Sequence, residues 1–115
     1  MKVIQNKWLD NFLNELKNTK DLKLVPPFIT DNMVTHLFKN WQGSTIQVIT
    51  RFNLNDFRSG VSSLKALRKL IENGAEIKGI KNLHSKVYIF DTKSMIITSA
   101  NFTNGGFFTN YGIRD

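Results

Sequence analysis

The sequence has no cysteine, which excludes disulfide bonds and zinc sites built on thiolates. It also lacks any apolar run near the ~20 residues that a membrane-spanning helix needs, and its first residues lack the apolar core of a signal peptide. We therefore expect a soluble, cytoplasmic protein without a membrane segment. No internal repeat is visible, and a chain of 115 residues is long enough for one compact domain.

Acidic residues are scarce: 9 Asp and Glu stand against 16 Lys and Arg, which gives a formal net charge of +7. Such an excess favours polyanionic partners, namely DNA, RNA or anionic lipid, although a lysine-rich surface is the simpler alternative. The sequence shows no cluster of carboxylates that could hold Mg²⁺. It also shows no helix-turn-helix or zinc finger, so any sequence specificity would come from another domain.

Hydrophobic periodicity predicts alternating helices and strands. Helices are expected over 4–18, from an N-cap at Asp31 to Gly43, and from Ser62 or Ser63 to Gly74, the last with its leucines and Ile71 inward. Strands are expected over 22–25, 45–50, 75–80, 86–91 and 95–99, with a loop over 51–60. A turn at 92–94 makes the last two strands a hairpin. The pattern predicts an α/β domain with a mixed sheet flanked by helices.

The candidate catalytic residues lie on or beside those last two strands. Side chains two residues apart in a strand share one face, so His84 and Lys86 point the same way, and so do Ser99 and Asn101. If the two strands pair, an imidazole, an ammonium, a hydroxyl and an amide converge, a set that suits a tetrahedral phosphate. Ordinary surface polarity is the alternative interpretation, and it is the better one for an isolated His-x-Lys pair.

The spacing His84-Ser85-Lys86, four residues, Asp91, six residues, Thr98-Ser99-Ala100-Asn101 resembles the HxK(x)4D(x)6GSxN signature of the phospholipase D superfamily. The flanking segments 73–78, 81–84, 102–106 and 110–111 are similar to those of its bacterial nuclease-like members, including those joined to restriction or helicase systems. The resemblance runs from about residue 45 to the end. We therefore divide the compact domain into an N-terminal helical segment, 1–44, and a phospholipase D-like core, 45–115.

The resemblance implies a role for each motif residue. His84 attacks phosphorus and forms a phosphohistidine, while Lys86 and Asn101 hold the non-bridging oxygens. The resemblance also implies that neither a metal nor another cofactor is needed, because protein cations take that place. Ser99 adds a phosphate contact, and Asp91 has a supporting role. Members of the superfamily need two such motifs, and the other histidine of this chain, His36, lacks the context. A homodimer with the active site at its interface is therefore expected.

Three positions near the end of the chain bear on this reading. Thr98 stands where the family usually has glycine. Gly112 stands where many relatives have a glutamate that orients the nucleophilic histidine, and Asp115 is a candidate substitute. The segment 111–115 resembles a strand cut short, so we expect the chain to be a fragment of a longer protein, truncated at its C-terminus.

The substrate is not fixed by the motif, because the superfamily includes lipases, lipid synthases and nucleases. The basic charge favours nucleic acid, with DNA expected before RNA, and Arg51, Arg58 and Lys81 are candidate contacts to backbone phosphates. The leading hypothesis is a metal-independent endonuclease. A nucleic-acid-binding domain without catalysis and a phospholipase remain as alternatives.

Overall fold

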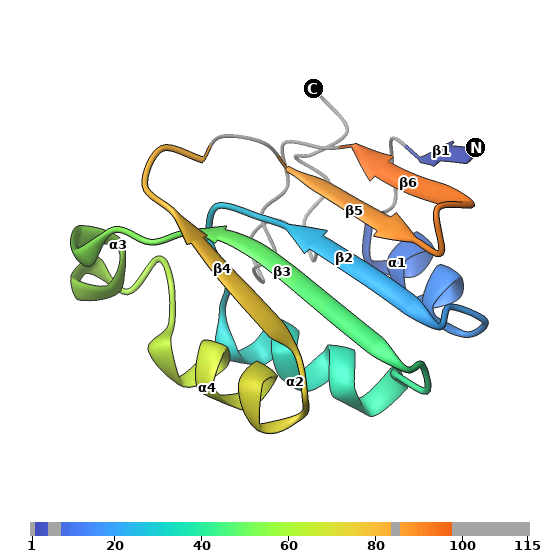
Figure 1. Cartoon of the computed structure of the whole chain (residues 1–115), viewed down its shortest axis with the longest axis horizontal. Helices are drawn as coiled ribbons and strands as arrows, with labels where there is room; N and C mark the ends of the chain where they lie inside the picture. The colour runs from blue at the N-terminus through green and yellow to red at the C-terminus, as the bar shows by residue number, and fades with distance from the viewer. Residues whose placement is uncertain (1, 5–7, 84–85, 98–115) are drawn as a thin grey trace.

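A six-stranded mixed sheet forms the centre of the protein in the computed structural model (Figure 1). The structure describes residues 2–4, 8–83 and 86–97. The strands, in chain order, are β1 (Lys2–Ile4), β2 (Asp21–Val25), β3 (Thr45–Arg51), β4 (Glu76–Ile80), β5 (Val87–Phe90) and β6 (Ser94–Ile97). Across the sheet they follow the order β1-β6-β5-β2-β3-β4. This arrangement confirms the predicted α/β class.

Strand direction changes at one strand. β5 is antiparallel to both of its neighbours, β2 and β6, whereas the pairs β1–β6, β2–β3 and β3–β4 are parallel. The predicted hairpin of β5 and β6 is confirmed, with Val87 opposite Ile97 and Phe90 opposite Ser94.

The helices are α1 (Trp8–Leu16), α2 (Asp31–Asn40), α3 (Leu54–Ser59) and α4 (Leu64–Glu72). α1, α2 and α4 lie against one face of the sheet, behind it in Figure 1. Burial alternates along the strands as a half-covered sheet requires: Leu22 and Leu24 of β2 are buried, and Lys23 between them is exposed. Within the core, Phe12 of α1 meets the ring of Tyr88 edge-on, with centroids 6.1 Å apart.

The beginning of the chain differs from the sequence prediction. The helix expected over 4–18 covers only Trp8–Leu16, and Ile4 belongs to β1. β1 pairs in parallel with β6, some ninety residues further along the chain. Helical periodicity does not register such a long-range pairing, which decides the conformation of this short segment.

The segment 51–60, expected to be a loop, contains α3. The side chain of Asn53 caps this helix by accepting a hydrogen bond from the Asn55 amide, at 2.9 Å. Gly60 ends it in the left-handed conformation, at φ 83°. The prediction was wrong because six residues give too little periodicity to stand out from a polar loop.

Two further boundaries are corrected. α2 begins at Asp31 with Thr30 as its N-cap, and its C-cap is Trp41 rather than Gly43. α4 begins after Ser63, as predicted, and the Ser63 hydroxyl accepts from the Ala66 amide at 3.1 Å. Leu64 and Ile71 of this helix were predicted to point into the core, and this was wrong: Leu64 is 56% and Ile71 is 60% exposed. The inward face is made instead by Ala66, Leu67 and Leu70.

Residues 1–44, predicted as an N-terminal segment, supply β2 at the middle of the sheet, between β5 and β3. They also supply α1 and α2, whose buried side chains share one core cluster with those of β3, α4 and β5. No helix in the described part of the chain has the length and apolarity needed to cross a membrane.

Candidate functional site

Five of the eight residues singled out from the sequence lie in the described part of the chain: Lys86, Asp91, Arg51, Arg58 and Lys81. His84, Ser99 and Asn101 lie outside the described residues, as do Thr98, Gly112, Asp115 and the expected strand 111–115. The geometry of the site is therefore given by the strand ends to which those residues are attached.

The strand directions bring to one end of the sheet the strand ends that adjoin the motif residues. β2, β3, β4 and β6 run in the same direction, so their carboxyl ends lie at this end, and the reversed β5 begins there. Val87 pairs with both Val25 and Ile97. We name this end, formed by Val25, Arg51, Ile80, Val87 and Ile97, the motif edge. In open α/β sheets, ligands characteristically bind outside the carboxyl ends of the strands.

Lys86 is half-buried and directly precedes Val87 at the motif edge. Residue 98 directly follows Ile97, the partner of Val87. The strand that begins after His84 and Lys86 is therefore hydrogen-bonded to the strand that leads into Ser99 and Asn101. The pairing of these two strands was the condition set by the sequence pattern, and it is met for Val87–Phe90 and Ser94–Ile97.

Asp91 lies at the opposite end of β5 from Lys86, roughly 15 Å away at the usual rise of a strand. Its carboxylate accepts hydrogen bonds from the backbone amides of Lys20, at 3.0 and 3.1 Å, and Asp21, at 2.7 Å. These bonds join the end of β5 to the beginning of β2. The supporting role expected for Asp91 stays a prediction, and this contact is the one through which Asp91 would exert it.

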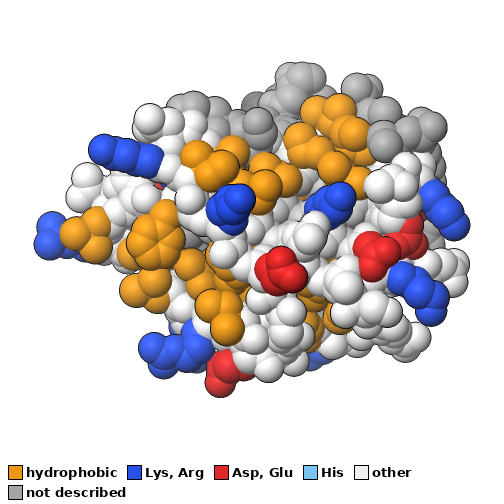
Figure 2. Space-filling model, viewed as in Figure 1, with side chains coloured by type: hydrophobic (Ala, Val, Ile, Leu, Met, Phe, Trp, Pro, Cys, Tyr) orange, Lys and Arg blue, Asp and Glu red, His pale blue; other side chains and the backbone are white. Residues whose placement is uncertain are grey.

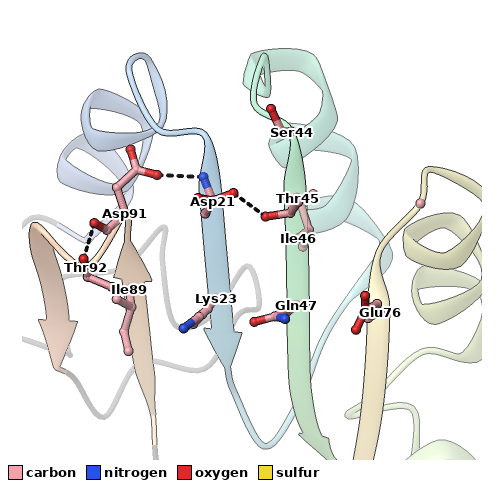
Figure 3. Close-up of a pocket in the computed structure, with 11 residues that line it drawn as sticks. Asp21, Lys23, Ser44, Thr45, Ile46, Gln47, Glu76, Ile89, Asp91 and Thr92 are labelled. Atoms are coloured by element: carbon pink, nitrogen blue, oxygen red, sulfur yellow. Dashed lines mark hydrogen bonds between the residues drawn. The ribbon is translucent and has the colours of Figure 1, made fainter.

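The network continues across the sheet: the Thr45 hydroxyl donates to the Asp21 carboxylate at 2.6 Å (Figure 3). An open hollow of about 370 Å³ lies on this side, bordered by Asp21, Gln47, Glu76 and Asp91. It is at the beginning of β2, β3 and β4, the end opposite the motif edge. The hollow and the predicted phosphate site are therefore separate places on the molecule.

Arg51, predicted as a phosphate contact, is the last residue of β3 and is engaged by Asp56 of α3. Its Nε and one terminal nitrogen donate to the two carboxylate oxygens at 2.7 and 2.8 Å. The guanidinium also lies over the Phe28 ring, 4.7 Å from its centroid. The hydrogen bond to Asp56 raises the pKa of Arg51 above its usual value. Sequence reasoning missed Asp56, because it treated 51–60 as a solvated loop.

Arg58 and Lys81 are both exposed, on α3 and directly after β4. Their segments are tied together by the Phe52 amide, which donates to the Ile80 carbonyl at 3.0 Å. Both cations therefore lie on the side of the molecule that contains the motif edge. Among the residues that the structure describes, no group of three or more metal-ligating side chains is close enough to hold an ion.

A match to a known protein family covers most of the chain. Residues 12–113 match the family described as "Cardiolipin synthase, PLD-like domain". No curated protein matches the chain. The match includes β2 to β6, all five residues of the motif edge and the whole of the motif, and it begins well before residue 45. Phosphodiesterase-type chemistry is general in this superfamily. The chain belongs to the phospholipase D-like domain family.

Proposed function

We propose that this chain provides one half of the active site of a metal-independent phosphodiesterase. It cuts nucleic acid, with DNA favoured over RNA as the substrate, and acts as a homodimer. The observation that carries the proposal is the pairing of Val87 with Ile97, because it makes neighbours of the strands that hold the two halves of the motif. The net charge of +7 supports a polyanionic substrate.

In the proposed reaction, a ring nitrogen of His84 attacks phosphorus and the bond to the leaving oxygen breaks. That oxygen takes its proton from the partner's His84. A water molecule then attacks phosphorus and gives its proton to the partner's His84, and the nitrogen–phosphorus bond breaks to release His84. Lys86, Ser99 and Asn101 stabilise the charge on the non-bridging oxygens through both steps.

The exposed cations Arg58 and Lys81 would hold backbone phosphates on either side of the cut. Arg51 would contribute less directly, because Asp56 already takes two of its donors. Its remaining donors lie at the carboxyl end of β3, so a phosphate contact additional to the Asp56 pair is part of the proposal.

The test is incubation of labelled DNA and RNA with the protein in EDTA, comparing wild type with His84→Ala and Lys86→Ala. Cleavage should persist in chelator, disappear with His84→Ala and fall by about 10²–10³-fold with Lys86→Ala. His36→Ala, which changes the histidine outside the motif, is the matched control and should retain activity.

Two outcomes would favour the alternatives. Salt-sensitive binding without cleavage would point to a non-enzymatic nucleic-acid-binding domain, for which Gly112 in place of glutamate is the motivating observation. Release of a headgroup from lipid vesicles, with nucleic acid left intact, would point to a phospholipase.

A further inference from the structure

An aromatic side chain is exposed beside the motif edge. Phe52 directly follows Arg51, the last residue of β3, and 54% of its surface is exposed. The Phe52 amide donates to the Ile80 carbonyl at 3.0 Å, which fixes its backbone against the end of β4. Ile80, which accepts that bond, is itself 41% exposed, so apolar surface is grouped here, and grouped apolar surface marks interaction sites.

The ring of Phe52 has two close neighbours. Its centroid lies 5.1 Å from that of Phe57 of α3, with the ring planes tilted by 56°. Gly79 of β4 lies beneath it, and a Cβ at Gly79 would be only 2.7 Å from the Phe52 Cβ. The glycine therefore makes room for the phenylalanine, and the two neighbours support an exposed aromatic surface.

The surroundings of this ring are basic. Arg58, Lys78 and Lys81 are all exposed on the segments that border it. Of the nearby acidic side chains, Asp56 is paired with Arg51, and Glu76 lies further down β4. Figure 2 shows hydrophobic side chains gathered over the β4 side of this face with Lys and Arg side chains around them. An aromatic surface among cations is complementary to a base attached to a phosphate backbone.

We propose that Phe52 stacks on a nucleobase, and that the substrate class is single-stranded or locally unpaired nucleic acid. This rests on the proposed function, which it narrows. In a duplex, each base is already stacked between its neighbours, so its face is not open to a protein ring. In a single strand, an exposed aromatic side chain binds that face with little regard to sequence, while flanking cations hold the phosphates.

The experiment measures the affinity of a fluorescent oligonucleotide by anisotropy, in the His84→Ala background so that nothing is cut. Three probes are compared: a single strand, the same sequence as a duplex, and a single strand of the same length with abasic sites. Phe52→Ala should weaken single-strand binding by about 10-fold. It should change duplex and abasic-strand binding by less than about 2-fold, because those probes offer no free base.

Further variants distinguish base stacking from a loss of folding and from a non-specific hydrophobic contact. Phe52→Trp should retain or strengthen single-strand binding, and Phe52→Leu should lose it while keeping apolar bulk over Gly79. Ile71→Ala is the matched control, since Ile71 is equally exposed but lies at the end of α4, away from the motif edge. Circular dichroism confirms that each variant folds.

Several results would overturn the inference. Equal losses on all three probes, or none on the single strand, would exclude stacking. Conversion of a dimer to a monomer by Phe52→Leu, seen by sedimentation, would make this surface a protein interface. Loss of binding to vesicles of anionic lipid, with oligonucleotide binding unchanged, would make it a membrane contact. Failure of the proposed function is a separate result: wild type would bind single strands through Phe52 yet cut nothing in chelator.

Discussion

The guanidinium of Arg51 and the carboxylate of Asp56 form a bidentate ion pair, with nitrogen–oxygen distances of 2.7 and 2.8 Å. The pair connects α3 to the end of β3. The side chains are 21% and 10% exposed, so the pair is largely shielded from water. It also positions the start of the segment that holds Phe52 and Arg58. One half of this pair was predicted to contact substrate, and its main observed contact is within the chain.

Asp56→Asn should destabilise the fold by about 2 kcal/mol, because it leaves the Arg51 charge without its partner in a mostly buried place. Urea unfolding monitored by tryptophan fluorescence measures this. Asp31→Asn is the matched control, since Asp31 pairs with Lys69 at 2.8 Å but both side chains are about a third exposed. It should cost clearly less. Equal losses in the two variants would contradict the importance given to the Arg51 pair.

Asp91→Ala should lower the free energy of unfolding by about 1–2 kcal/mol, because the amides of Lys20 and Asp21 lose an ionised acceptor. Activity per folded molecule should be nearly unchanged, since Asp91 is at the far end of β5 from Lys86. Thermal unfolding and a cleavage assay on the same preparation test both parts. An inactive variant of unchanged stability would instead place Asp91 in the chemistry.

Tyr88 predicts a loss of stability in alkali. Its side chain is fully buried, and burial raises the pKa of the phenol well above its ordinary value of about 10. Above pH ~10 the unfolded chain releases the phenolic proton and the folded chain does not, so stability falls as pH rises. Below that pH the contribution is constant.

The matching variant is Tyr88→Phe, which should show a shallower decline between pH 9 and 11 by up to about 1.4 kcal/mol per pH unit. Urea unfolding at a series of pH values measures the slope. Lysine deprotonation affects both proteins alike and cancels in the comparison. Identical slopes would mean that Tyr88 is ionised in the folded protein or remains protonated in both states.

Arg58→Gln and Lys81→Gln should each weaken nucleic-acid binding and lower the slope of log affinity against log salt by about 0.7–1. The reason is that a variant with one phosphate contact fewer releases one counterion fewer when it binds. Lys93→Gln is the control, because Lys93 is exposed in the turn between β5 and β6, at the opposite end of the sheet. A slope change for Lys93 equal to that for Lys81 would argue against a defined phosphate track.

Much of the framework was predictable because its signals are local. The alternation of β3, the Ser63 cap of α4 and the turn between β5 and β6 were all recognised from neighbouring residues. The identity of β1 was not, because only its pairing with Ser94–Ile96 makes it a strand. Leu64 and Ile71 were assigned to the core because leucine and isoleucine usually are buried; the helix instead turns Ala66 inward.

The site was predictable to a different degree. The spacing of two residues predicts that Lys86 belongs to a phosphate site, and this stays a prediction. The structure shows that Val87, which follows Lys86, pairs with Ile97, which precedes residue 98. The partners of Arg51 could not be found in this way. Asp56 is five residues away and Phe28 more than twenty, and only the fold brings both to one guanidinium.

The reversed direction of β5 bears on where new chain termini can be introduced. β5 begins at the motif edge and β6 ends there, and the chain turns back between them at Thr92 and Lys93, at the opposite end of the sheet. New termini opened in that turn would leave each half of the motif on its own strand, still bonded to its neighbours. The protein is thus suited to splitting into two complementary pieces, and only their reassociation would restore the proposed site.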